Sequence, residues 1–435
     1  MNDTRPSRRR FLRSVVATAG GAASIPLARE LFRTERAFGA QLDGLRTSGD
    51  PSWSPQDLRD RYMLDPSVVY LNHASIGTVP RAVHEAHTAY LAACESNPWL
   101  YMWGGAWEEG REAARASLAT LVGAGPDDVA ITHNTTEGFN LLARGLPLGP
   151  GDEVLFSTLN HAGASVCFDH VAAEKGYSVR RFELDPLDAA AMTPDELMDA
   201  HVRAVRPATR LLVLPHVDNV VGVRHPLEAL GAAVRRRGVR WVAADGAQTV
   251  GMLPLDLPAS GVDFYAGSPH KWVQSPKGLG LLYVRAELRD VLRPMWVTWG
   301  QDRWEGTVRV FEDYGTRNLP AVLALGDAAD FQIALGGADK VRRYRRMREN
   351  LRERVEASPG LRWRSPTSFD DGASLVAIEV TGRSAPELAE TLWREHGVVL
   401  RAFGGELDTL RVSPNVVTAD EELERFAALL ETAAR

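Results

Sequence analysis

Lysine is rare in this chain and is concentrated in one short segment. The sequence has 435 residues and 50 lysines and arginines together, yet only four of these are lysine. Two of the four, Lys271 and Lys277, lie in GSPHKWVQSPKGLGLLYV at 267–284. A lysine amine that loses its proton attacks carbonyl groups, whereas an arginine side chain stays charged. The segment therefore indicates Lys271, directly after His270, as a reactive amine.

The other three lysines have simpler interpretations. Lys277 stands in SPKG, which is typical of a turn before a strand. Lys175 and Lys340 lie at polar helix ends, where we expect solvated side chains. Lys271 is therefore the preferred candidate, and Lys277 is the alternative.

Further polar groups are expected at the same edge of a sheet as Lys271. Asp245 ends the apolar run VRWVAAD, and Lys271 follows 26 residues later, just before another apolar run. Thr135 and Thr136 follow the run DVAIT and open a helical segment, whose hydroxyl and free N–H groups suit a phosphate. Parallel strands bring such residues to one edge. An amine, a carboxylate and a phosphate cradle match pyridoxal 5′-phosphate, which needs a Schiff-base lysine and an acid at its pyridine nitrogen.

Several motifs along the chain resemble one protein family, in the same order. YLNHASIGTVP at 70–80, the segments around Asp245 and Lys271, and LRVSPNVVT at 410–418 are similar to the class V aminotransferases among the fold-type I pyridoxal-phosphate enzymes. Within that family, the isopenicillin N epimerase-like subgroup is the most similar. The resemblance implies an enzyme that acts at the α-carbon or amino group of a small-molecule substrate, either an amino acid or a compound derived from one.

The resemblance also assigns roles to individual residues. It implies that Lys271 forms the Schiff base, that Asp245 pairs with the pyridine nitrogen and that His161 stacks on the cofactor ring. The implied cofactor-binding residues are Thr135, Thr136, Asn219, Asp245, Gln248, Ser268, His270, Lys271, Gly315 and Thr316. Among these, Gly315 and Thr316 would reach the phosphate site of a neighbouring subunit, so the resemblance implies a homodimer.

Substrate binding is expected to involve residues from both ends of the chain. Arg411 resembles the family arginine that grips the substrate α-carboxylate, a task that suits a planar bidentate donor. Asn72 is expected to bind substrate as well. Each role has an alternative, since Arg411 can be a surface arginine, His161 an ordinary polar histidine and Asp245 a helix cap.

The sequence leaves the reaction type open. We expect aminotransferase-type chemistry, with Lys271 as the base nearest the α-carbon. Epimerisation, and a lyase or oxidative decarboxylation in the tailoring of a secondary metabolite or siderophore, are the alternatives. Cysteine desulfurase activity is not expected, because VVLRAFGGELDTLRVSP at 398–414 has no cysteine ahead of Arg411. A non-catalytic binding module is the alternative outside catalysis, and the retained Lys271 and Asp245 argue against it.

The N-terminus carries an export pattern. SRRRFL at 7–12 resembles the twin-arginine signal, and the uncharged stretch at 14–28 that follows it is too short to span a bilayer. Small residues at Ala37 and Gly39 mark a candidate cleavage site. We therefore expect residues 1–39 to be a signal peptide for the twin-arginine translocase, and the mature protein to be periplasmic or extracytoplasmic without a stable membrane anchor.

The order of apolar and helical segments predicts the fold. From about residue 110 short apolar runs alternate with amphipathic helical segments, which is typical of an α/β protein with a mostly parallel sheet flanked by helices. We expect an N-terminal segment at 40–84, a large cofactor-binding domain at 85–310 and a smaller α+β domain at 311–435. Within the latter, 318–358 is predicted to be one long helix.

Composition narrows the function classes. The formal net charge is −6, and the charged residues are interspersed, so a nucleic-acid partner is not expected. Cys94 and Cys167 are the only cysteines and lack metal-ligand spacing. The sequence therefore predicts no metal site, and it leaves open whether these two cysteines pair.

Overall fold

A seven-stranded sheet forms the centre of the protein. The computed structural model describes residues 25–45 and 53–435. All neighbouring strands of the sheet are parallel, except that β8 runs antiparallel to β2 and β7. In spatial order the strands are β2 (Val129–Thr132), β8 (Gly280–Val284), β7 (Phe264–Gly267), β6 (Trp241–Asp245), β5 (Thr209–Pro215), β3 (Glu153–Ser157) and β4 (Ser178–Phe182). The expected mostly parallel sheet is confirmed.

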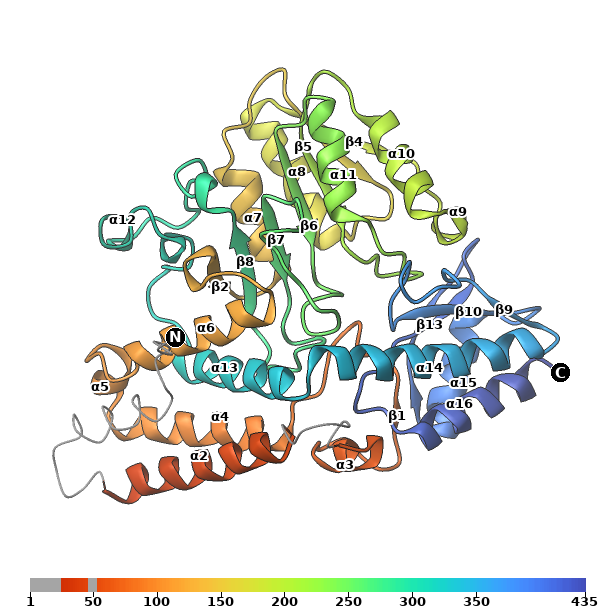
Figure 1. The fold of residues 1–435 in the computed structure, drawn as a ribbon, viewed down its shortest axis with the longest axis horizontal. Coiled ribbons are helices and arrows are strands. Elements are labelled where there is room, and N and C mark those ends of the chain that lie inside the picture. The colour runs from red at the N-terminus through yellow and green to blue at the C-terminus, as the bar shows by residue number, and fades with distance from the viewer. Residues whose placement is uncertain (1–24, 46–52) are drawn as a thin grey trace.

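Helices cover both faces of this sheet (Figure 1). Side chains alternate between the faces along each strand, so Phe156 of β3 joins the core under α7 (Thr135–Gly145) and α8 (Ala162–Lys175), whereas Leu155 joins the core on the other face. Helices that contribute to this second core include α4 (Arg81–Ser96), α6 (Glu108–Leu121), α11 (Leu227–Arg236) and α13 (Leu319–Ala334). Burial on both faces explains why the strands are almost continuously apolar, except for the edge strand β4, which is partly exposed and carries two arginines.

Shorter helices lie in the connections around the sheet. They are α5 (Pro98–Met102), α9 (Pro186–Ala191), α10 (Pro194–Ala204) and α12 (Gly300–Arg303). Three of them, α5, α9 and α10, begin with proline, whose fixed backbone angle suits the first helical position.

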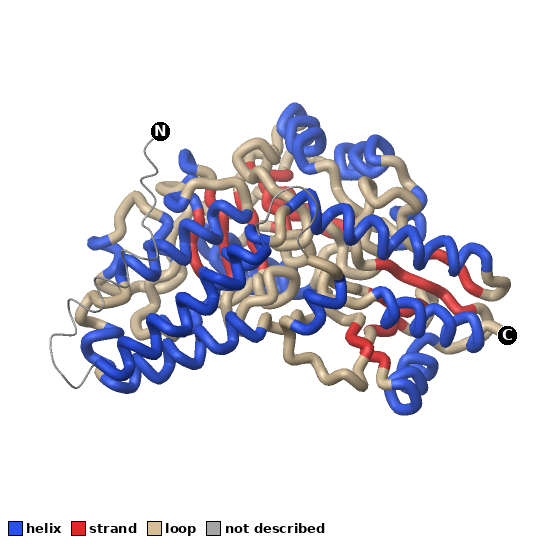
Figure 2. The backbone as a smooth tube through the Cα atoms, turned by 60° about the horizontal axis from the view of Figure 1, so that its bottom comes forward, coloured by secondary structure: helices blue, strands red, loops and turns tan. Residues whose placement is uncertain are grey.

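A smaller antiparallel sheet lies apart from the central one (Figures 1 and 2). Its spatial order is β12 (Arg401–Phe403), β13 (Thr409–Val412), β10 (Val376–Val380) and β9 (Leu361–Trp363). The helices of this part are α14 (Gly337–Ala357), α15 (Ala385–His396) and α16 (Asp420–Ala433). In addition, β1 (Val69–Tyr70) pairs in parallel with β11 (Val398–Val399), so chain from before the central sheet contributes to this part of the molecule.

The predicted single helix at 318–358 is wrong, because the chain bends by 74° between α13 and α14. Gly336 lies at the break with φ of 78°, a left-handed conformation that glycine adopts without steric cost. Before the bend, α13 packs on α6 and α4 beside the central sheet, and after it α14 packs on α16. Among the described residues, no single helix is long and apolar enough to cross a membrane, and α13 with α14 meets that criterion only as this bent pair.

Lys340 contradicts the expectation of a solvated lysine. Its side chain is only 4% exposed, and its Nζ donates to the Gly251 carbonyl at 2.9 Å and to the Gln332 side chain at 3.1 Å. The bend carries the first turn of α14 back toward the end of α13, which explains this burial. Lys175 is half-buried and donates to the backbone carbonyls of Arg144 and Leu146.

The N-terminal chain packs on both parts of the molecule. Helix α2 (Ile25–Leu45) lies along α4 and buries Phe38, Leu42 and Leu45. Helix α3 (Pro55–Asp60) lies near α16, where Arg59 pairs with Glu422 at 3.0 Å. The twin-arginine pattern at 7–12 lies outside the described residues, whereas the candidate cleavage site at 37–39 lies inside α2.

Candidate active site

A cavity of about 460 Å³ opens where the parallel strands end. Its lining comes from the ends of β2, β3, β5, β6 and β7, from the loop after β1 and from the smaller sheet. The lining residues are Ala74, Ser75, Asn134, Thr135, Thr136, His161, Gly163, Ala164, Pro215, Val217, Asn219, Asp245, Ala247, Gln248, Ser268, His270, Lys271, Arg401 and Arg411. Most of the predicted site residues therefore share one cavity.

Asp245 and Lys271 form the charged centre of this cavity. Asp245 ends β6, is 7% exposed and accepts a hydrogen bond of 2.9 Å from the Ala247 N–H. Burial raises the pKa of Asp245, although Lys271 and His161 oppose this. Burial lowers the pKa of Lys271 to about 8, against the opposing effect of Asp245. An amine with this pKa has a substantial neutral fraction near neutral pH, as a nucleophile or base requires.

The backbone at Lys271 is held from the loop after β1. The Gly77 N–H donates to the His270 carbonyl at 2.8 Å. A Cβ at Gly77 would lie 2.0 Å from the Lys271 carbonyl oxygen, so the two chain segments meet in a way that only glycine permits. The NHASIG segment therefore fixes the position of the reactive lysine.

The start of α7 provides the expected anion cradle. The Thr135 N–H donates to the Ser268 hydroxyl at 3.1 Å, and the two hydroxyls lie 2.7 Å apart. Asn134, which the sequence analysis did not single out, caps the helix by accepting from the Glu137 N–H at 2.9 Å. The Nδ1 of His270 is buried without a hydrogen-bond partner in the described chain. The Thr135 and Ser268 hydroxyls at a helix N-terminus, together with the unpartnered ring nitrogen of His270, fit a phosphate group.

Gln248 and His161 lie on the walls of the cavity. The Gln248 amide is held in one orientation, because its Nε2 donates to the Ala74 carbonyl at 3.0 Å and its Oε1 accepts from Trp272 at 2.9 Å. His161 caps α8, and its Nδ1 accepts from the Gly163 N–H at 3.0 Å. That bond leaves its other ring nitrogen free for a group in the cavity.

Arg411 lies on β13 with its guanidinium turned into the cavity wall. It is 3% exposed and donates to the Asn219 carbonyl at 2.9 Å, to the Asn72 side chain at 3.0 Å and to the Ser75 hydroxyl at 2.5 Å. All three acceptors are neutral, so the positive charge remains available to an anion. Asn72 is thus a support for Arg411 rather than part of the cavity lining. Ser75, in the same NHAS motif, escaped the sequence analysis.

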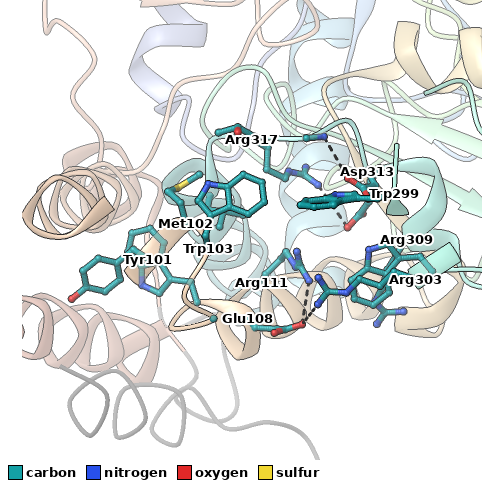
Figure 3. Close-up of a pocket in the computed structure, with 17 residues that line it drawn as sticks. Tyr101, Met102, Trp103, Glu108, Arg111, Trp299, Arg303, Arg309, Asp313 and Arg317 are labelled. Carbon is teal, nitrogen blue, oxygen red and sulfur yellow. Dashed lines mark hydrogen bonds and ion pairs between the residues drawn. The ribbon is translucent and has the colours of Figure 1, made fainter. Parts of the chain in front are cut away.

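Gly315 and Thr316 do not lie in this cavity. They line a second one of about 290 Å³, together with Trp103 and Trp299, whose rings lie 6.4 Å apart (Figure 3). There Glu108 pairs with Arg303 at 3.4 Å. Within one chain Gly315 and Thr316 are therefore separate from Lys271, and their expected role at a neighbouring subunit stays a prediction.

Comparison with known proteins identifies the family. The aminotransferase class-V model matches residues 69–426. The chain belongs to this family. Isopenicillin N epimerase from Streptomyces clavuligerus is 33% identical over 399 residues, which cover 86% of this chain and 97% of that protein.

Two solved structures of class V enzymes have the same fold. The cystine C–S lyase C-DES, as a lysine-to-alanine variant with glycine covalently linked to pyridoxal phosphate, has a TM-score of 0.78 and 25% identity over 86% of this chain and 98% of that chain. The cysteine desulfurase CsdA from Escherichia coli has a TM-score of 0.74 and 26% identity over 88% and 98%. The fold is therefore fold-type I, and the cofactor is pyridoxal 5′-phosphate.

The similarity to desulfurases weakens one expectation. Cys94 is buried in α4, and Cys167 lies in α8, where burial raises its thiol pKa to about 11. Both are free thiols, and neither belongs to the described residues that line the cavity. Family membership nevertheless does not separate this chain from desulfurases, since CsdA is similar along almost its whole length. The absence of desulfurase activity stays a prediction that rests on the missing thiol.

Proposed function

We propose that this class V enzyme acts at the α-carbon and amino group of an amino acid or amino-acid-derived substrate by aminotransferase-type chemistry. The observation that supports the proposal is that one cavity contains the Lys271 amine, the Asp245 carboxylate and the Arg411 guanidinium. A carboxylate binder and a base with a lowered pKa are the groups that proton removal next to a carboxylate requires.

Each residue then has a distinct task. Bound pyridoxal phosphate withdraws electrons from the substrate α-carbon. Thr135, Ser268 and the start of α7 hold its phosphate, and Asp245 keeps a proton on its pyridine nitrogen. Arg411 binds the substrate carboxylate in a bidentate geometry, which orients the α-carbon. Lys271 takes the α-proton and returns it.

The position at which the proton is returned decides the product. Return away from the α-carbon by Lys271 transfers the amino group, whereas inversion needs a second proton donor that protonates the α-carbon from the face opposite Lys271. Inversion is the second candidate, because an isopenicillin N epimerase is 33% identical across 97% of its length. Loss of a β-substituent, or an oxidative decarboxylation, in the tailoring of a secondary metabolite or siderophore is the third.

Mass spectrometry in heavy water separates these outcomes. The cofactor-loaded protein is incubated under air with a panel of amino acids, and substrate, cofactor and enantiomer ratio are measured. Pyridoxamine phosphate with a 2-oxo acid is the expected result. Deuterium at the α-carbon with inverted configuration and unchanged cofactor would instead establish epimerisation, and a shortened product would establish a lyase or decarboxylase.

A pair of lysine variants controls this experiment. Lys271→Ala should abolish every conversion, whereas Lys277→Ala, which changes an exposed lysine six residues away, should retain it. A biological role that survives Lys271→Ala, together with no conversion by the unaltered protein, would favour a binding module over an enzyme.

We also propose that the protein is exported through the twin-arginine translocase and works outside the cytoplasm. The support is the order of SRRRFL and the uncharged stretch after it. Replacement of Arg8 and Arg9 by lysine should retain the full-length chain in the cytoplasm, as measured by cell fractionation. Unchanged export of that variant would contradict the proposal.

A further inference from the structure

A second arginine, Arg401, lines the active-site cavity beside Arg411. The two lie on neighbouring strands, β12 and β13, and are direct partners in the antiparallel register. Residues that face each other in this way project from the same side of the sheet. Arg401 is exposed, whereas Arg411 is buried. The cavity therefore has one arginine in its wall and another nearer to solvent.

This pairing is unfavourable for the protein alone. Like charges directly across a strand pair destabilise it. The two guanidinium groups lie 5.3 Å and 5.9 Å from the centre of one ring, that of Phe403. In the chain as described, no hydrogen bond or ion pair joins the Arg401 guanidinium to a carboxylate, whereas Arg364 in the same small domain pairs with Glu379 at 2.7 Å. Among the described residues, the charge on Arg401 thus has an aromatic ring beside it but no acidic partner.

The cavity lining carries more positive than negative side chains, which also favours the binding of an anion. Among the described lining residues Asp245 is the single acid, against Lys271, Arg401 and Arg411. Burial lowers the pKa of His161, Asp245 opposes this, and the three cations lower the pKa further. Arg401 therefore acts electrostatically across the cavity and is not merely a surface charge at its edge.

We propose that Arg401 binds a second carboxylate of the substrate, so that the enzyme selects amino acids or amino-acid-derived molecules with two carboxylates. The buried Arg411 holds the α-carboxylate, and the exposed Arg401 holds the distal one. The inference rests on the proposed function and narrows its substrate class. In the competing arrangement both arginines hold the same carboxylate. Loss of Arg401 would then weaken the binding of molecules with one carboxylate as much as that of molecules with two.

Calorimetric titration of the holoenzyme tests the inference without catalysis. The probes are glutarate and pentanoate, which have the same number of carbon atoms and differ in one carboxylate. The protein should bind glutarate about tenfold more tightly, as expected for a charge-assisted hydrogen bond, and added salt should reduce this preference. In Arg401→Met the preference for glutarate over pentanoate should largely disappear. Arg383 is an exposed arginine outside the cavity lining, so Arg383→Met should preserve the preference.

Turnover by a charge-reversed variant provides the second readout. Arg401→Glu should shift the preference from glutamate toward lysine, because a carboxylate now faces the distal substrate group, and Arg401→Lys should partly retain the original preference. An unchanged glutarate preference in Arg401→Met, or an equal loss of glutarate and pentanoate binding, would overturn the inference. If no amino acid is turned over but the glutarate preference depends on Arg401, the proposed function fails and the dicarboxylate site stands.

Discussion

The Arg411 guanidinium donates to the Asn72 side-chain oxygen at 3.0 Å, across 339 positions of sequence. This bond joins the smaller sheet to the loop after β1 that also fixes Lys271. Removing the acceptor, as in Asn72→Leu, leaves a buried cation with one bond fewer, which costs about 1.5–3 kcal/mol. We expect KM for an amino acid substrate to rise about tenfold or more, with a smaller effect on kcat.

A charged variant of Asn72 separates the effect on the position of Arg411 from the effect on protein stability. In Asn72→Asp the new carboxylate pairs with Arg411 and competes with the substrate carboxylate. We expect this variant to melt no lower than the unaltered protein and still to show a raised KM in steady-state kinetics. A normal KM in both Asn72 variants would mean that Arg411 needs no support from this loop.

Lys340 should make stability depend on pH. Burial lowers the pKa of Lys340 from 10.5 to about 7, so between these pH values the unfolded chain binds more protons than the folded one. The contribution of the Lys340 amine to the free energy of unfolding therefore rises as the pH increases from 7 toward 10.5. The free energy of unfolding of the holoenzyme, measured with urea at several pH values in this window, should increase less with pH for Lys340→Met than for the unaltered protein. Identical slopes would show that Lys340 titrates as in solution.

Glu312 and Arg115 form a buried bidentate pair just ahead of Gly315. Their bonds measure 2.5 Å and 2.8 Å, and Glu312 also accepts from the Ile131 N–H at 2.6 Å. Glu312→Gln should reduce the free energy of unfolding by about 3 kcal/mol, because the buried Arg115 loses this counter-charge and keeps only Glu112, which lies 3.1 Å from its Nε. The exposed change Glu305→Gln is the control for loss of one charge. Equal denaturation midpoints for the two variants would contradict this expectation.

Complementation between two inactive variants tests the expected homodimer. If Thr316 serves the phosphate site of a neighbouring subunit, Lys271→Ala and Thr316→Glu fall in the same site of a mixed dimer, and the other site of that dimer stays intact. Random mixing should restore about a quarter of the sites in a two-subunit assembly. The measurement is activity after co-refolding, with light scattering to establish the mass. A monomeric mass, or no recovery from two variants that fold and bind cofactor, would count against this role of Thr316.

Helix α2 extends across the predicted signal-peptide cleavage site, so its contribution to stability tests whether the signal peptide ends at residue 39. Phe38 is 1% exposed, and a chain that begins at residue 40 lacks it together with most of α2. Loss of a buried phenylalanine side chain costs about 3–5 kcal/mol. We therefore expect residues 40–435 to unfold at a clearly lower temperature than residues 25–435, and Phe38→Ala in the longer chain to account for much of the difference. Equal stability would show that α2 is dispensable, as a signal peptide ending at residue 39 requires.

The groups at the ends of the parallel strands could be predicted from the sequence. Thr135 follows one apolar run, Asp245 ends another and Lys271 comes just before a third, and parallel strands deliver such residues to one edge whatever the details of packing. The cofactor and the fold class could be predicted for this reason. Ser268 was implied by the family resemblance.

The features that depend on strand register and on packing between distant segments could not be predicted without the tertiary structure. Arg401 faces Arg411 only through the register of β12 on β13, and a shift by one residue would move it to the other face. Lys340 is buried because Gly336 allows a sharp bend in what local helical pattern presents as one helix. The pairing of Arg401 with Arg411 has no local signal, because it results from contacts between elements. The Gly336–Gly337 pair is a local signal for a helix break, but the burial of Lys340 after the bend depends on how α14 packs.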